Sequence, residues 1–167
     1  MSKINIQKSA LEQLKNFSLP TELGFGKVLA PIMLTAEYNN KEWGDFIISP
    51  YKKIELDPTC KVLHYAQEIF EGLKAYLSPE GDPVLFRPEM NAKRFNHSAM
   101  MMAMPKIPNN LFLDAVKHIT WHCKDLIPKE SGSSLYIRPF MFSSEDSLGI
   151  KPSEKFKFMI VASPCAS

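Results

Sequence analysis

Hydrophobic residues recur at helical spacing in two segments near the middle of the chain. The first segment begins at Pro88, whose missing N–H costs nothing at a first helical position. Its apolar positions, expected to face the core, are Ala92, Phe95, Ala99 and Met102. The second segment begins at Asn109 or Asn110, which are good capping residues, and ends before Pro128. Its expected buried stripe is Phe112, Ala115, Val116, Ile119, Cys123 and Leu126.

Two later segments alternate with the period of a β-strand. In residues 134–144 one face carries Leu135, Ile137 and Met141, and the other carries Tyr136, Arg138, Phe140 and Phe142. Residues 155–163 alternate in the same way. Shorter strands are predicted within 28–54 and at 62–66, 72–77 and 84–86, and a short helix at 9–17. Runs of strands with two grouped helices indicate an α+β domain, in which a mainly antiparallel sheet carries the two principal helices.

Composition narrows the class of protein. A chain of 167 residues suits one domain, and 20 basic against 18 acidic residues give a formal charge of only +2. This balance favours neither a nucleic-acid partner nor a membrane surface. Three widely spaced cysteines with no Cys-x-x-Cys pair argue against a disulfide framework, and the polar N-terminus lacks the apolar core of a signal peptide. We therefore expect a cytoplasmic protein.

Tyr136 and Arg138 are the first candidates for binding chemistry. They lie two apart on a predicted strand, so they emerge on one face together with aromatic residues. The planar guanidinium of Arg138 matches a carboxylate in bidentate fashion, which would make a substrate clamp. An arginine that lies over apolar surface with its head in water is an equally good interpretation of the spacing alone.

Two other stretches are open to both functional and structural interpretations. Arg94 shares a polar helix stripe with Asn91 and Ser98 and could meet a phosphate, although pairing with Glu89 or water is the simpler expectation. Residues 64–72 gather a histidine, two acids and two aromatics next to a glycine, which suggests a loop lining a site. The alternative is an ordinary strand end with half-buried aromatics.

A helical histidine pair resembles a zinc site only superficially. His118 and His122 have the four-residue spacing of zinc metalloproteases, but Ile119 stands where the general-base acid must follow the first histidine. Both histidines also flank the apolar stripe. We expect no metal site here.

Longer words of the sequence carry a family resemblance from about residue 24 to the end. They are GFGKVLAPIMLTAEY (24–38), LHYAQEIFEGLKAY (63–76), LFRPEMNAKRF (85–95), SLYIRPF (134–140) and SLGIKPS (147–153). In order and spacing these words resemble the branched-chain amino-acid aminotransferases of pyridoxal-phosphate fold type IV. The resemblance implies a transaminase that moves an amino group between leucine, isoleucine or valine and 2-oxoglutarate, with pyridoxal 5'-phosphate as cofactor.

The resemblance also assigns roles to individual positions. Arg94 would bind the cofactor phosphate. The pocket for the substrate side chain and its carboxylate would be lined by Phe25, Tyr65, Phe70, Tyr136 and Arg138. An aromatic box suits a branched aliphatic side chain, while an arginine in the same box suits the side-chain carboxylate of glutamate. Leu148 and Ile150 would reach into the site of a neighbouring subunit, which implies a homodimer.

The family's catalytic lysine is expected elsewhere. The resemblance places that lysine, which holds the cofactor as a Schiff base, in a second half, and no lysine here stands in the matching position. Residues 1–163 would form the N-terminal small domain and 164–167 the start of the interdomain linker, with the C-terminal cofactor domain absent. We expect the 167 residues alone to be inactive and to hold the cofactor weakly or not at all.

A different class of function remains open. The chain could be a stand-alone binding or dimerisation module that keeps the small-domain fold without catalysis. The intact set of Arg94, Tyr136 and Arg138 favours the enzyme, because a module released from catalysis has no evident need for all three.

Overall fold

The computed structural model describes residues 3–166, and residues 1, 2 and 167 of the predicted domain and linker lie outside the described residues. The strands are β1 (Ile4–Ile6), β2 (Ile32–Asn39), β3 (Glu42–Trp43), β4 (Phe46–Pro50), β5 (Glu68–Phe70), β6 (Leu73–Leu77), β7 (Pro83–Leu85), β8 (Ser134–Ser143) and β9 (Phe156–Cys165). The helices are α1 (Lys8–Asn16), α2 (Lys61–Tyr65), α3 (Pro88–Met101) and α4 (Asn109–His122), followed by a 3-10 turn at Lys124–Leu126.

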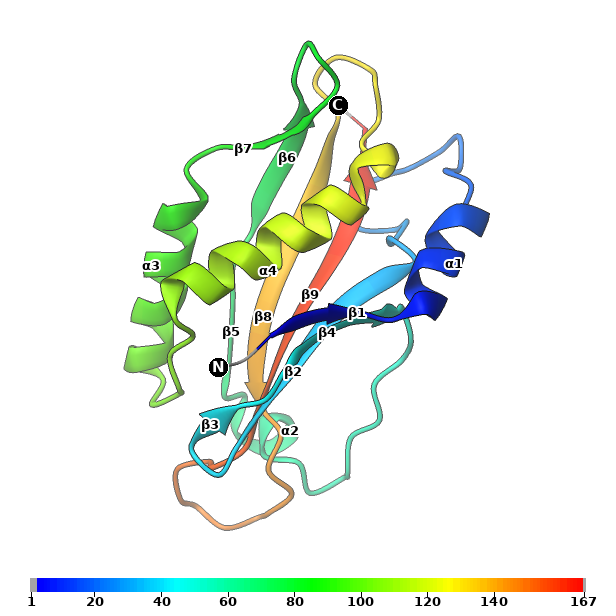
Figure 1. Ribbon diagram of the computed structural model, residues 1–167. Coiled ribbons are helices and arrows are strands. Elements are labelled where there is room, and N and C mark those ends of the chain that lie inside the picture. Colours follow the sequence, from blue (N-terminus) through cyan, green and yellow to red (C-terminus); the bar gives the residue numbers. More distant parts are fainter. Residues whose placement is uncertain (1–2, 167) are drawn as a thin grey trace.

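The strands form one curled sheet in the order β1-β4-β2-β9-β8-β6-β7, with β3 paired to β2 and β5 to β8 (Figure 1). Among the described strands, every pairing except that of β1 with β4 is antiparallel. The longest ladder joins β8 to β9, from Ser134 opposite Cys165 to Ser143 opposite Phe156. The predicted α+β class with a mainly antiparallel sheet is therefore confirmed.

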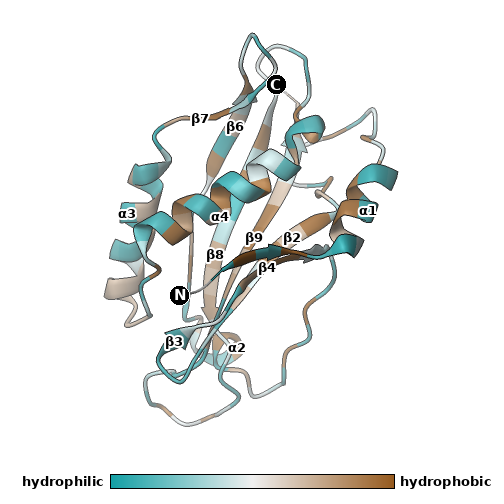
Figure 2. Ribbon diagram, in the orientation of Figure 1, coloured by the Kyte–Doolittle hydropathy of each residue, from teal (hydrophilic) through white to brown (hydrophobic). Residues whose placement is uncertain are grey.

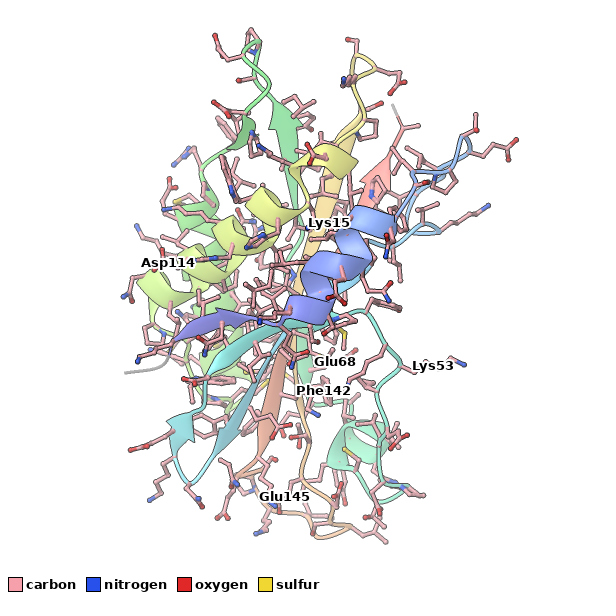
Figure 3. The ribbon with its side chains drawn as sticks, turned by 45° about the vertical axis from the view of Figure 1, so that its right-hand side comes forward. Lys15, Lys53, Glu68, Asp114, Phe142 and Glu145 are labelled. Atoms are coloured by element: carbon pink, nitrogen blue, oxygen red, sulfur yellow. The ribbon has the colours of Figure 1, made fainter. Side chains whose placement is uncertain are left out.

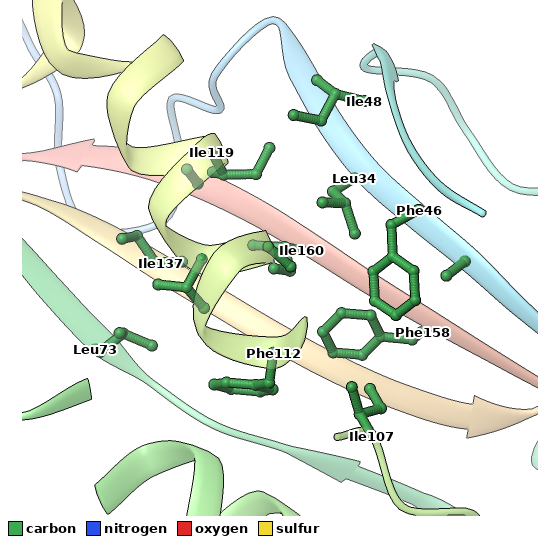
Figure 4. Close-up of a cluster of buried hydrophobic side chains, with 14 of the residues drawn as sticks. Leu34, Phe46, Ile48, Leu73, Ile107, Phe112, Ile119, Ile137, Phe158 and Ile160 are labelled. Atoms are coloured by element: carbon green, nitrogen blue, oxygen red, sulfur yellow. The ribbon is translucent and has the colours of Figure 1, made fainter. Parts of the chain in front are cut away.

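Helix α4 crosses one face of the sheet and supplies the centre of the core (Figure 1). Its predicted apolar stripe is buried, and Figure 4 shows Phe112 and Ile119 in one cluster with Ile137 and Ile160 of the sheet. Helices α1, α3 and α4 show both hydrophilic and hydrophobic stretches in Figure 2, as amphipathic helices on a core should. No helix in residues 3–166 is long and apolar enough to cross a membrane.

Helix α3 is confirmed with one correction to its buried face. Ala92, Phe95 and Ala99 are buried as predicted, but Met102 lies just beyond the end of the helix and is 39% exposed. Ala103 adopts a positive φ of 52°, which turns the chain away before another helical turn can form. The predicted caps of α4 are also wrong, because Pro108 occupies the N-cap position and no side chain caps that end.

The predicted strand at 62–66 is wrong, since these residues belong to the short helix α2. Five residues are too few for hydrophobic period to separate a helical turn from a strand. A tertiary contact favours the helix instead, because Lys61 is 1% exposed and its Nζ lies 3.1 Å from Glu145 Oε1. Ala66, at a positive φ of 48°, ends the helix and donates its N–H to Val62 O.

Phe158 is the strongest test of the core, because its ring contacts those of Phe46, Phe95 and Phe112 from three different elements. We expect Phe158→Ala to lower the free energy of unfolding by about 3–5 kcal/mol through lost contacts and a residual cavity. Urea unfolding measures the loss. Phe86→Ala is the matched control: Phe86 is 81% exposed, so the free energy of unfolding should change by no more than about 0.5 kcal/mol. Similar losses for both variants would contradict this core.

Candidate active site

Strand β8 has one face toward the core and a second face that is partly open to solvent. Leu135, Ile137 and Met141 are buried toward α4, as the alternation predicts. Tyr136 and Arg138 point to the opposite face and are half-buried there. Tyr136 and Arg138 therefore lie on the face of β8 that does not pack against the core.

Four predicted site residues meet on this face, and we call them the arginine–aromatic cluster: Phe25, Phe70, Tyr136 and Arg138. Arg138 donates from Nε and Nη2 to Tyr136 Oη, at 3.0 and 2.6 Å. Its guanidinium carbon lies 4.2 Å from the centroid of the Phe70 ring. The rings of Phe25 and Tyr136 are 5.0 Å apart. The cluster thus combines one cation with three aromatic side chains, which can receive an apolar group and a carboxylate side by side.

The turn at residues 24–26 explains how Phe25 reaches the cluster. Gly24 and Gly26 both have positive φ, at 59° and 69°, a conformation that other residues adopt only with strain. The two glycines turn the chain so that the Phe25 ring lies against Tyr136, while the residue as a whole stays 65% exposed.

Gly72 gives Tyr136 the space for its hydroxyl. A Cβ at this position would lie 2.5 Å from Tyr136 Oη and 3.2 Å from two ring carbons. Only glycine therefore lets the hydroxyl stay where it accepts the two hydrogen bonds of Arg138. The sequence shows this glycine within a dense stretch, but its contact with Tyr136 appears only in the fold.

Arg94 pairs with Glu71, which directly precedes Gly72 and is not among the predicted site residues. Glu71, only 4% exposed, accepts hydrogen bonds from Arg94 Nε and Nη2, the latter at 2.6 Å. Asn91 donates to the same carboxylate at 2.9 Å. These hydrogen bonds and the negative charge raise the pKa of Arg94 above its ordinary value. The expected partner Glu89 instead lies 3.9 Å from Arg87.

A third group lies at the loop that follows β8. Tyr65 donates its hydroxyl to Leu148 O at 2.7 Å, and Leu148 and Ile150 are 60% and 93% exposed. Ile150 and Tyr65 also line a hollow of about 510 Å³ with Met101 and Met102. Among residues 3–166, no hydrogen bond or ring contact joins Tyr65 to the arginine–aromatic cluster. Tyr65 instead contacts the loop that carries Leu148.

Glu145 anchors the loop that carries Leu148 and Ile150. Its carboxylate receives Lys61 Nζ at 3.1 Å, Lys151 Nζ at 3.3 Å and the N–H of Glu154 at 2.7 Å. Figure 3 shows Glu145 in the part of the molecule where α2 lies. Burial by itself would raise the pKa of Glu145, but the hydrogen bonds of Glu154, Lys61 and Lys151 outweigh it and lower the pKa to about 2.

His118 and His122 lie one turn apart on α4. Within residues 3–166, no group of three or more His, Cys, Asp or Glu side chains could hold a metal ion. The rings of His118 and His122 stack 6.2 Å apart. Burial, and then the nearby His118, lower the pKa of His122.

Comparison with known proteins connects this geometry to a family. Branched-chain-amino-acid transaminase 1 of Bacillus subtilis (strain 168) is 45% identical over 149 residues, which cover 89% of this chain and 42% of that protein. The fold matches a T.th. branched-chain amino acid aminotransferase with pyridoxamine 5'-phosphate, with a TM-score of 0.62 and 23% identity over 89% of this chain and 42% of the other. The same enzyme complexed with 4-methylvaleric acid gives a TM-score of 0.58 and 26% identity, over 76% and 39%. No family model matches the chain.

The fold is that of the N-terminal domain of fold-type-IV pyridoxal-phosphate enzymes. Within that class, the chain belongs with the branched-chain amino-acid aminotransferases and corresponds to their N-terminal part. It spans less than half the length of the curated relatives it matches.

Gly72→Ala tests the steric link between Gly72 and Tyr136. We expect it to lower the free energy of unfolding by about 1–3 kcal/mol, because the new methyl group displaces the Tyr136 hydroxyl from Arg138. In a Tyr136→Phe background the hydroxyl is already gone, so the same glycine change should cost markedly less. Urea unfolding of the four proteins measures this coupling, and equal costs in both backgrounds would contradict the contact.

Acid should weaken the anchored loop through Glu145. Because the folded state lowers the pKa of this residue from 4.5 to about 2, its contribution to stability is complete above about pH 4.5 and is lost as the pH falls toward 2. The stability difference between the wild type and Glu145→Gln should therefore shrink across this window. Glu154→Gln, at a side chain 81% exposed, is the control, for which a small and constant difference is expected. A Glu145→Gln difference that stays constant from pH 7 to 2 would contradict the ion-pair network.

Proposed function

We propose that this chain supplies the substrate-binding part of a branched-chain amino-acid transaminase that uses pyridoxal 5'-phosphate. The enzyme would exchange the amino group of leucine, isoleucine or valine with 2-oxoglutarate, forming glutamate and the branched 2-oxo acid. The observation that carries this proposal is the arginine–aromatic cluster, where Arg138 is held by Tyr136 against the ring of Phe70. We place the enzyme in the cytoplasm, in keeping with three free, buried cysteines.

The cluster suits two unlike substrates. The rings of Phe25, Phe70 and Tyr136 offer apolar surface to a branched aliphatic side chain. Arg138 lies among them with its fork fixed by the Tyr136 hydroxyl, ready to meet the side-chain carboxylate of glutamate or 2-oxoglutarate. The T.th. enzyme that matches this fold is known with 4-methylvaleric acid, a branched aliphatic carboxylate. This likeness supports the same substrate class for the chain.

The residues present also fit the phosphate of the cofactor. Arg94 is oriented by a buried carboxylate, yet its side chain is 64% exposed, so an anion can approach its outer edge. When bound, pyridoxal 5'-phosphate supplies the carbonyl that exchanges with the amino group and the ring that accepts electrons. The part of Arg94 is to bind the phosphate, while Tyr136 and Arg138 orient the substrate beside it.

The cofactor-binding lysine and the second subunit would complete the active site. We propose that the lysine that binds the cofactor lies outside these 167 residues, that residues 1–163 form the small domain, and that the interdomain linker begins at 164. Strand β9 continues to Cys165, so it overlaps the first two residues of the proposed linker. Leu148 and Ile150, exposed on the anchored loop, would enter the site of a second subunit in a homodimer. No catalytic residue is assigned within the chain.

Substitution of Arg138 tests the substrate-binding role. In the aminotransferase that contains this chain, we expect Arg138→Met to raise the KM for 2-oxoglutarate by about 10–100-fold, because a charged hydrogen-bonding partner of the carboxylate is lost. The KM for the 2-oxo acid of leucine should change far less. Arg87→Met, at an exposed arginine paired with Glu89, is the control and should alter neither value. Equal increases for both substrates would contradict the role of Arg138.

The isolated chain provides a second test. Purified residues 1–167 should show no transamination above background when pyridoxal 5'-phosphate, leucine and 2-oxoglutarate are supplied. Turnover that survives removal of every other protein would overturn the proposed position of the lysine.

A further inference from the structure

Glu71 joins three elements of the candidate site. It lies between β5 and β6, and its own N–H donates to Pro139 O of β8 at 2.8 Å. Its carboxylate receives Asn91 and Arg94 of α3. Asn91 Nδ2 also lies 3.4 Å from Gly72 O. The position of Arg94 is therefore fixed relative to the strand that carries Tyr136 and Arg138.

The pairing leaves one edge of Arg94 available. Glu71 is approached by Nε and Nη2, so the bidentate contact occupies one side of the guanidinium. Nη1 makes no hydrogen bond within the described part of the chain. A free arginine side chain has many rotamers, and binding has to overcome the loss of this conformational entropy. Because Glu71 already restricts these rotamers, an anion that binds the open edge loses less entropy on binding.

Stability alone gives a poor reason for this arrangement. Burying a carboxylate costs desolvation energy, and a buried ion pair is often no more stabilising than apolar residues of similar volume. Here the carboxylate is 4% exposed, while most of the Arg94 side chain faces solvent. A buried Glu71 that holds an exposed Arg94 is the arrangement expected if Glu71 orients Arg94.

We propose that Glu71 is a positioning residue, which holds the guanidinium of Arg94 for the phosphate group of the cofactor. Asn91 assists by fixing the Glu71 carboxylate. This inference rests on the proposed function, because it takes the phosphate role of Arg94 as its starting point.

Charge and position make opposite predictions for Glu71. The negative charge of Glu71 repels a phosphate, so its removal would tighten phosphate binding if charge alone mattered. Positioning predicts weaker binding, because Gln cannot accept both Arg94 hydrogen bonds and the guanidinium is released. The sign of the effect therefore separates the two accounts.

The experiment compares the affinities of the complete aminotransferase for pyridoxal 5'-phosphate and for pyridoxal, which lacks the phosphate. We expect Glu71→Gln to weaken binding of the phosphorylated ligand on the order of tenfold, the scale on which orienting residues act, and to leave pyridoxal affinity unchanged. Arg94→Gln should show at least the same selective loss. Glu71→Asp, which keeps the charge, should recover part of the selectivity. Phe46→Leu, a buried change in β4, controls for general destabilisation.

Each remaining outcome has a definite meaning. If Glu71→Gln weakens both ligands equally, as a fold defect does, or binds the phosphorylated ligand more tightly, the positioning role is overturned. If Arg94→Gln retains the wild-type preference for the phosphorylated ligand, the proposed role of Arg94 fails and Glu71 loses its role with it. A selective loss in Arg94→Gln but not in Glu71→Gln rejects the positioning role while leaving the proposed function intact.

Discussion

The antiparallel pairing of β8 with β9 is the constraint on which the rest of the structure depends. Ten residues of each strand are in register, so every second side chain of β8 is committed to one face. Ile137 and Met141 are buried in the core with α4, and Tyr136 and Arg138 lie on the opposite face. A slip of one residue would bury the arginine and expose the core. The stability of the fold and the geometry of the site are thus set by the same ladder.

Two buried glutamates, Glu71 and Glu145, hold the parts of the candidate site that lie outside the sheet. Glu71 ties α3 to the junction of β5 and β6, and Glu145 ties α2 to the loop after β8. Each glutamate binds charged side chains that the hydrophobic core cannot hold: Arg94 in the case of Glu71, and Lys61 and Lys151 in the case of Glu145. In both places several hydrogen bonds to one carboxylate offset the cost of its burial. These contacts restrain Arg94 and the loop after β8, although much of their surface is exposed.

Periodic segments could be predicted from the sequence, whereas contacts between distant segments could not. The alternation around Arg138 and the apolar stripe of α4 repeat over enough residues for the period to identify the element and its buried face. The helix α2 is too short for this, and its conformation depends on Glu145, which lies 84 residues away. Closeness in the sequence favours pairing of Arg94 with Glu89, whereas its partner in the structure, Glu71, lies 23 residues away. One feature of the sequence does indicate this partner. Asn91 and Arg94 place two hydrogen-bond donors on one stripe of the helix, and a carboxylate can accept from both.

We propose that this chain forms the substrate-binding part of a larger pyridoxal-phosphate enzyme. The most direct measurement is the mass of the native polypeptide that contains this sequence, after borohydride has fixed the cofactor to its lysine. The account predicts a polypeptide more than twice as long as 167 residues, because the chain covers 42% of its Bacillus subtilis relative, with the label beyond residue 167. A native polypeptide of 167 residues that carries no cofactor would contradict the claim and favour a binding or dimerisation module.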